Sequence, residues 1–154
     1  VAAIKAELRI PVIANGDIDS PERAREVLAH TGADALMIGR AALGRPWLFG
    51  QIVHFLEHGT HAPPPCTRDV QRWLLEQLHE HYGLYGESPG ARSARKHIGW
   101  AVRPLPGGEA LRERVNALQD ARAQIEAVTA FFDALAARHP RLPAADDEAR
   151  QVAA

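Results

Sequence analysis

Two short runs of apolar residues, separated by a helix-like segment, constrain the fold of this chain more than any other feature. The runs are IPVIA at residues 10–14 and ADALMIG at residues 33–39. Continuous apolar runs of this length are typical of strands that are buried on both faces in a parallel sheet. The segment between them is long enough for the crossover that joins two parallel strands. The pattern therefore predicts a strand–helix–strand unit with parallel strands.

The predicted crossover helix has signals at both of its ends. Ser20 is a suitable N-cap, and Pro21 fits the first turn of a helix. Gly32 fits the position just after the last turn, where a left-handed backbone is common. We therefore expect a helix that begins after Ser20 and ends before Gly32.

A stretch with three consecutive prolines, THAPPPCT, divides the chain. Such a stretch forms a stiff, extended connector. A short helical turn at residues 41–43 and a helix over 46–57 are predicted before it. Helical apolar spacing after it predicts three helices over residues 68–85, 91–102 and 109–137, the last interrupted at Arg122. We divide the chain into an α/β part at 1–59, a linker at 60–67, a helical domain at 68–138 and a disordered, Pro- and Ala-rich tail at 139–154.

The composition limits the classes of protein to which the chain can belong. Hydrophobic residues make up 46% and charged residues 24%, with a net charge of −1, which is typical of a globular protein. The apolar runs are too short to span a bilayer. The single cysteine, Cys66, excludes an internal disulfide and fits a reducing compartment. We therefore expect a cytoplasmic protein with no membrane partner.

Polar residues follow both predicted strands at the same end of the sheet. NGD comes directly after the first strand, and GR after the second. Glycines allow backbone N–H groups to approach an anion, and an arginine fork suits a phosphate. Each segment alone is an ordinary turn sequence, but their pairing favours a phosphate site of the kind found at this end of (β/α)8 barrels. The residues that this chemistry points to are Gly16, Gly39 and Arg40.

The second predicted helix carries a cationic stripe. Residues 88–103 contain four basic residues and no acidic one. At about 100° per residue, the basic side chains share one side of the helix, opposite Ala94, Ile98, Ala101 and Val102. A solvated charged face is the alternative interpretation, but such faces usually mix charges of both signs. The pattern therefore leaves open a second interpretation, contact with nucleic-acid phosphates by Arg92, Arg95, Lys96 and Arg103.

Longer strings resemble one known family. Residues 10–49 are similar to the end of the barrel in the tRNA-dihydrouridine synthases. HYG at 81–83, ARKHIGW at 94–100 and LPG at 105–107 resemble the bacterial B-type branch of that family. That branch usually has an aromatic residue where this chain has Ala101. From residue type alone, we expect His97 to be a hydrogen-bonded boundary residue and Trp100 to pack between helices.

The resemblance implies a fold and a function. The fold class is α/β plus all-α: the last two βα units of a (β/α)8 TIM barrel, followed by a small C-terminal helical domain that binds tRNA. The implied activity is the FMN-dependent reduction of uridine in tRNA to 5,6-dihydrouridine, with NADPH as reductant. The NGD and GR segments, which are Asn15, Gly16, Asp17, Gly39 and Arg40, would hold the phosphate and ribityl chain of FMN. The resemblance also favours contact of the cationic stripe with tRNA phosphates over a solvated face. We expect the chain to be the C-terminal portion of a monomeric enzyme.

The resemblance also implies what this segment lacks. The family's catalytic cysteine lies on an earlier loop of the barrel, so we expect no catalytic residue here, and Cys66 is not a candidate. The isolated chain would then be inactive. The histidines at 54, 58 and 61 lack the spacing of a metal site, and no metal is expected. Two alternatives stay open: another FMN- or phosphate-binding barrel oxidoreductase that acts on a small metabolite, or an inactive tRNA-binding fragment.

Overall fold

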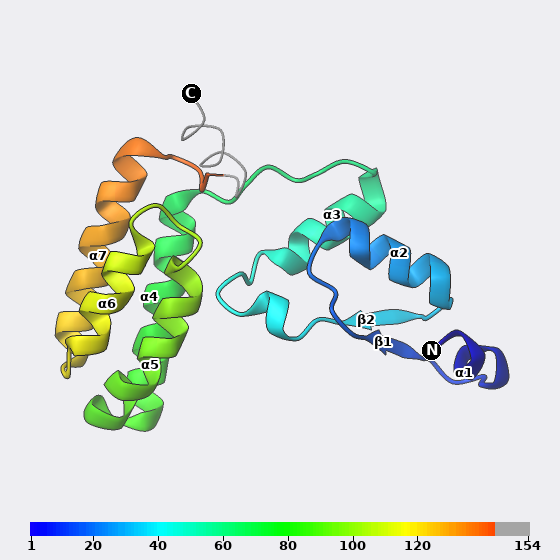
Figure 1. The fold of residues 1–154 in the computed structure, drawn as a ribbon, viewed down its shortest axis with the longest axis horizontal. Helices are drawn as coiled ribbons and strands as arrows, with labels where there is room; N and C mark the ends of the chain where they lie inside the picture. The colour runs from blue at the N-terminus through cyan, green and yellow to red at the C-terminus, as the bar shows by residue number, and fades with distance from the viewer. Residues whose placement is uncertain (144–154) are drawn as a thin grey trace. The chain divides into compact units, whose positions relative to one another are not determined.

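The computed structural model describes residues 1–143. The chain forms two compact units (Figure 1): unit 1 is Val1–Pro63, and unit 2 begins at Pro64. The division falls inside the proline run. No helix in the described part of the chain is long and apolar enough to cross a membrane.

Unit 1 contains the predicted strand–helix–strand arrangement. The two strands are parallel neighbours, with Ala14 opposite Leu36 and Asn15 opposite Met37. Both strands are only three residues long, shorter than the apolar runs that predicted them. The elements are α1 (Ala2–Glu7), β1 (Ile13–Asn15), α2 (Pro21–Thr31), β2 (Ala35–Met37), the 3-10 turn η1 (Arg40–Ala42) and α3 (Leu48–His58).

The ends of α2 confirm the sequence signals. The Ser20 hydroxyl accepts a hydrogen bond from the backbone N–H of Arg23, and Pro21 is the first residue of the helix. Gly32 follows the last turn with φ 62°, in the left-handed region where a side chain would be strained. The helix therefore begins and ends where local chemistry requires it.

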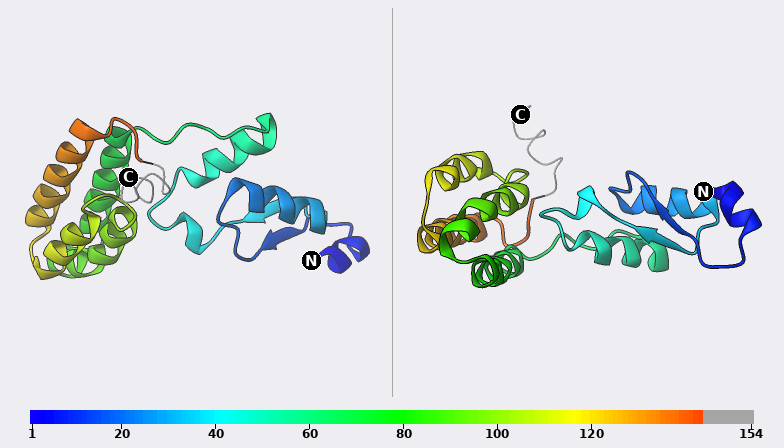
Figure 2. Two further views of the ribbon diagram at one scale, coloured as in Figure 1. Left: turned by 45° about the horizontal axis from the view of Figure 1, so that its top comes forward. Right: turned by 90° about the horizontal axis from the view of Figure 1, so that it is seen from below.

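Only one face of the two-stranded sheet is covered. Helices α2 and α3 lie on the same side of the strands (Figure 2), and the core between them is built from Ile18, Ala24, Leu48 and Ile52, with Leu36 and Ile38 packed against it. Ile13 and Met37 face the other way and are 55% and 56% exposed. The prediction that both strands are buried on both faces is therefore wrong for this chain, because no described element packs on the second face.

Unit 2 is a bundle of α4 (Thr67–Tyr85), α5 (Glu87–Val102), α6 (Gly108–Ala117) and α7 (Ala121–Arg138). Its core side chains come from all of these helices and include Leu74, Leu78, Ile98, Val102, Leu111, Val115, Val128 and Phe132. The prediction of a single helix over residues 109–137 is wrong. Two helices form instead, because α6 ends at Ala117 and α7 begins at Ala121, so the interruption lies before Arg122 and not at it. The Asp120 carboxylate accepts from the N–H of Ala123 at 2.7 Å and so starts a new helix.

Residues 139–143 differ from the expected disordered tail. Arg141 forms an antiparallel bridge with Cys66, and the Leu142 N–H donates to the Pro65 carbonyl at 3.0 Å. The side chain of Leu142 is buried. The prolines lack N–H groups but keep their carbonyls, so the proline run can order this short segment. Residues 144–154 lie outside the described residues.

Candidate functional site

The loops that follow β1 and β2 form a cleft in unit 1. Because the strands are parallel and in register, their carboxyl ends meet at one edge of the sheet. The Asn15 side-chain amide donates to the Met37 carbonyl at 3.3 Å and ties the first loop to the end of β2. The cleft has a volume of about 720 Å³ and is lined by Asn15, Gly16, Asp17, Ile18, Asp19, Met37, Gly39, Arg40 and Ala41. All five residues predicted for the phosphate site line it.

The backbone of this cleft is open to an approaching group. Gly16 has φ 137°, and Asp17 has φ 44°. A Cβ atom built on Gly16 or on Gly39 would meet nothing within 4 Å. The turn η1 uses the amides of Ala42 and Leu43, which donate to the carbonyls of Gly39 and Arg40. The amides of Arg40 and Ala41 therefore lie outside the turn's own hydrogen bonds.

Arg40 is held by Asp17 across the two loops. Its Nη2 atom donates to Asp17 Oδ1 at 2.8 Å, and both side chains are more than four-fifths exposed. An ion pair this exposed contributes little to stability, so it can rearrange at low cost. The bond to Asp17 uses one nitrogen of a guanidinium with five N–H donors. The arrangement is chemically able to hold a phosphate.

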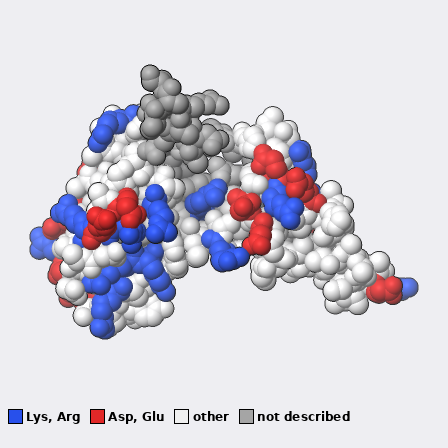
Figure 3. All heavy atoms as spheres, viewed as in Figure 1, with Lys and Arg blue, Asp and Glu red and all other residues white. Residues whose placement is uncertain are grey.

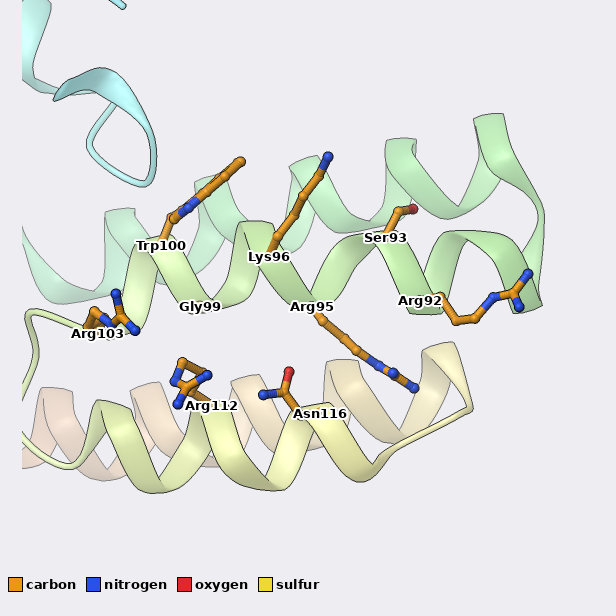
Figure 4. A pocket seen from close by; sticks show the side chains of 9 residues that line it. All are labelled: Arg92, Ser93, Arg95, Lys96, Gly99, Trp100, Arg103, Arg112 and Asn116. Carbon is orange, nitrogen blue, oxygen red and sulfur yellow. The ribbon is translucent and has the colours of Figure 1, made fainter. Parts of the chain in front are cut away.

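A second cleft, which we call the cationic pocket, lies between α5 and α6 in unit 2. It has a volume of about 390 Å³. Figure 4 shows Arg112 and Asn116 rising from α6 toward α5, while Lys96 and Trp100 project to the other side of α5. Its lining residues are Arg92, Ser93, Arg95, Lys96, Gly99, Trp100, Arg103, Arg112 and Asn116. All four residues of the predicted cationic stripe therefore line the same pocket.

One acidic residue on α6 reduces the charge of this pocket. The Arg112 Nε atom donates to Glu109 at 2.9 Å, and Arg103 Nε lies 4.0 Å from the same carboxylate. The hydrogen bond from Arg112 lowers the pKa of Glu109 below its usual value. Arg92 and Lys96 have no acidic partner in the described part of the chain. In Figure 3, basic atoms gather over α5 and α6 with an acidic group among them.

Arg95 has a role in the fold that the sequence pattern did not indicate. Its Nη2 atom donates to the carbonyl of Leu118 at 2.9 Å, just beyond the end of α6. Its Nε atom is buried and has no hydrogen-bond partner among the described residues. Figure 4 shows the side chain directed from α5 toward the α6–α7 turn. A cation at the end of a helix also interacts favourably with its dipole.

Five residues that line the pocket were not identified from the sequence: Ser93, Gly99, Trp100, Arg112 and Asn116. Arg112 and Asn116 come from α6, and no local pattern shows which side of α6 faces α5. Trp100 was expected to pack between helices, but it is 37% exposed and lines the pocket. This expectation is wrong, because the Trp100 side chain projects from α5 on the side away from α6 (Figure 4) and is partly exposed.

The described residues contain no group of three side chains suited to hold a metal ion. His54 and His58 stack on each other with ring centroids 4.4 Å apart, as i,i+4 neighbours on α3. Cys66 is half-buried at the N-cap position of α4, a position that the sequence did not reveal, and its backbone forms the bridge to Arg141. No nucleophile–base pair is formed at any of these positions in the described structure.

Comparison with known proteins assigns the chain to a family. A model of the dihydrouridine synthase family (Dus) matches residues 1–136. The chain belongs to the dihydrouridine synthase family. The resemblance seen in its motifs is thereby confirmed.

Several dihydrouridine synthase relatives are about half identical to the chain. It is 54% identical over 132 residues to tRNA-dihydrouridine synthase B of Pseudomonas aeruginosa, which covers 86% of this chain and 40% of the relative. It is 49% identical over 149 residues to tRNA-dihydrouridine synthase B of Xanthomonas axonopodis pv. citri, covering 97% and 44%. The protein of the same name from Vibrio cholerae is 49% identical over 136 residues, covering 88% and 42%. The chain thus spans about two fifths of the length of these relatives.

Proposed function

We propose that this chain is part of a cytoplasmic, monomeric, FMN-dependent tRNA-dihydrouridine synthase that reduces uridine in tRNA to 5,6-dihydrouridine with NADPH. Unit 1 supplies the last two βα units of the TIM barrel, including the end that binds the FMN phosphate. Unit 2, with its proline-rich approach, is the C-terminal helical domain that binds tRNA. Membership of the dihydrouridine synthase family supports the activity.

The observation that carries the proposal is the meeting of the NGD and GR loops at the carboxyl ends of two parallel strands. In this position, Arg40 and the amides of Arg40 and Ala41 would hold the phosphate of FMN. Gly16 and Gly39 leave room for it, because a Cβ at either would occupy open space. Asn15 keeps the loop in place through Met37. FMN, when bound, supplies the hydride that reduces the uracil ring.

The second part of the proposal concerns tRNA. Arg92, Lys96 and Arg103 are exposed cations in one pocket, and such cations bind nucleic-acid phosphates by releasing counterions. Arg112 joins this set, since it lines the same pocket. Arg95 acts mainly by fixing the end of α6, on which Arg112 and Asn116 stand. We therefore assign Arg95 a positioning role in addition to its proposed contact with tRNA phosphate.

The uncovered face of the sheet supports the assignment to a barrel. Ile13 and Met37 are apolar and exposed on that face, and in a closed barrel such side chains fill the interior. Two strands cannot close a barrel on their own. We accordingly propose that the isolated 154-residue chain has no synthase activity and behaves as a tRNA-binding fragment. No catalytic residue is assigned within it.

The alternative of a barrel enzyme that acts on a small metabolite is less well supported. Such an enzyme would also use Arg40 and the glycine loops to bind a phosphate. It has no evident use for a cationic pocket formed by two helices beyond the proline run. The pocket therefore favours a polyanionic substrate.

A chimera tests the proposal. This chain would replace the matching segment of the Pseudomonas aeruginosa relative, to which it is 54% identical. We expect the chimera to form dihydrouridine in tRNA with NADPH and to retain FMN on dialysis. Arg40→Ala should weaken FMN binding by about tenfold or more, since a charge-assisted hydrogen bond contributes roughly 1.5–3 kcal/mol.

The matched control is Arg23→Ala, which removes an exposed arginine of α2 outside the cleft. It should leave FMN retention unchanged. Thermal melting verifies that each variant is folded. A folded chimera that forms no dihydrouridine would refute the proposed activity, and equal FMN retention by the Arg40→Ala and Arg23→Ala variants would refute the phosphate assignment.

A further inference from the structure

A third cleft lies between α4 and α5, next to the cationic pocket. Its volume is about 690 Å³, and its surface is mostly apolar. It is lined by Gln77, Glu80, His81, Leu84, Tyr85, Pro89, Ser93, Lys96 and His97. Ser93 and Lys96 line both clefts, so the two clefts adjoin each other. We call it the aromatic cleft.

A row of rings forms the aromatic cleft and its border with the cationic pocket. The ring centroids of Tyr85 and His81 are 4.6 Å apart, those of His81 and His97 are 5.1 Å apart, and those of His97 and Trp100 are 5.2 Å apart. The His81 ring is held by a contact of 2.6 Å between its Nε2 atom and Ser93 Oγ. Tyr85 is 56% exposed at the end of α4. The row therefore presents flat aromatic surface to solvent.

The charges of the two clefts differ. The cationic pocket is lined by four arginines and Lys96, whereas the charged side chains that line the aromatic cleft include one lysine, Lys96, and one carboxylate, Glu80. Partial burial, together with the nearby charges of His81 and Lys96, lowers the pKa of His97. This shift favours the uncharged form of the His97 ring. An anion gains little in the aromatic cleft, whereas a flat, uncharged ring can stack there.

We propose that the aromatic cleft binds an unpaired nucleobase of the RNA strand whose phosphates lie in the cationic pocket. The inference deepens the proposed function and rests on it. The base stacks on Tyr85 or His97, as bases do on exposed aromatic side chains. Gln77 and Glu80 offer an amide and a carboxylate to the edge of the base. Lys96, shared by the two clefts, lies where base and phosphate meet.

The test compares two oligomers of equal charge on the full 154-residue chain. One is a ten-nucleotide single-stranded RNA, and the other is the same oligomer with every base removed. We expect the chain to bind the base-bearing oligomer about tenfold more tightly, the size of effect that one stacked base produces. Tyr85→Leu/His97→Leu should abolish the preference and keep the salt dependence of binding. Tyr85→Phe/His97→Phe retains flat rings and should preserve the preference.

A second pair of variants separates this inference from the proposed function. Arg92→Ala/Arg103→Ala should weaken binding of both oligomers and reduce the slope of log K against log salt by roughly 0.7 per lost contact to a single strand. Arg122→Ala/Arg138→Ala on α7 removes the same charge outside both clefts and should change neither. Equal binding of the two oligomers by the wild-type chain, or a preference that survives the double Leu substitution, overturns the aromatic-cleft proposal. Failure of the wild-type chain to bind tRNA or either oligomer overturns the tRNA-binding assignment and the cleft proposal together.

Discussion

A hydrogen bond between the half-buried Tyr82 and the buried Gln124 ties α4 to α7 in unit 2. The Tyr82 hydroxyl donates to Gln124 Oε1 at 2.8 Å, and Gln124 Nε2 donates to the Ala91 carbonyl at 3.0 Å. Gln124 is fully buried. Tyr82→Phe leaves the buried Gln124 Oε1 atom without its hydrogen-bond donor. We therefore expect the free energy of unfolding to fall by about 1–2 kcal/mol. Chemical denaturation measures it, and Tyr85→Phe, which changes an exposed tyrosine, is the control.

Tyr82 also makes the stability of unit 2 depend on pH in the alkaline range. Burial raises the pKa of Tyr82 to about 12, from the usual 10.0. Between these values the unfolded chain loses its proton and the folded chain keeps it, so stability falls as pH rises from 10 toward 12. Tyr82→Phe removes this contribution. The stability difference between wild type and variant should shrink over this range, and a constant difference would contradict the assignment.

The residues of the candidate sites were predictable where one local rule decides them. The NGD and GR loops follow their strands directly, so the parallel register alone brings Asp17 to Arg40. The buried side of α5 also follows from its helical spacing. By contrast, Arg112 reaches the cationic pocket because of how α5 packs on α6, which depends on shape complementarity across the core. The exposure of Trp100 has the same origin.

At the scale of elements, the junction between α5 and α6 depends on one glycine. A Cβ on Gly108 would lie 1.7 Å from the Val102 carbonyl oxygen, so the backbone would have to move. We expect Gly108→Ala to lower the free energy of unfolding by about 1–3 kcal/mol, the usual cost of overpacking. Gly83→Ala is the matched control within α4, because its Cβ would meet nothing within 4 Å. It should stabilise the helix by roughly 0.5–1 kcal/mol. Equal melting temperatures for the two variants would contradict this packing.

Element ends were predictable from capping residues, but not from apolar spacing. Ser20 and Gly32 delimit α2 as expected. The break before α7 was missed because apolar residues continue through it at helical spacing, with Leu118 followed by Ile125. Asp120, which caps α7, was the available signal. A capping residue inside a periodic segment therefore deserves more weight than the periodicity itself.

At the scale of the whole molecule, the two units differ in how completely they bury their apolar surface. In unit 2 the core side chains Leu78, Ile98, Val128 and Phe132 are completely buried within the helical bundle. Unit 1 covers one face of a sheet whose strands have three residues each, and Ile13 and Met37 stay exposed on the other face. Sequence patterns predicted the division into an α/β part and a helical part. The degree of burial was not predictable, because it depends on which elements pack against the sheet.

This difference predicts unequal resistance to hydrogen exchange in the isolated chain. Local opening requires little free energy where few apolar contacts are lost, and much more inside a complete core. Amides of α4, α5 and α7 should therefore exchange at least about tenfold more slowly than those of β1 and β2. Mass spectrometry of peptides after deuterium labelling measures both sets in one sample. In the chimera with the Pseudomonas aeruginosa relative, added strands would cover the exposed face, so protection should rise in β1 and β2 and stay unchanged in α7. Equal protection of both units in the isolated chain, or a chimera with no gain in β1 and β2, would show that unit 1 is already complete without further strands.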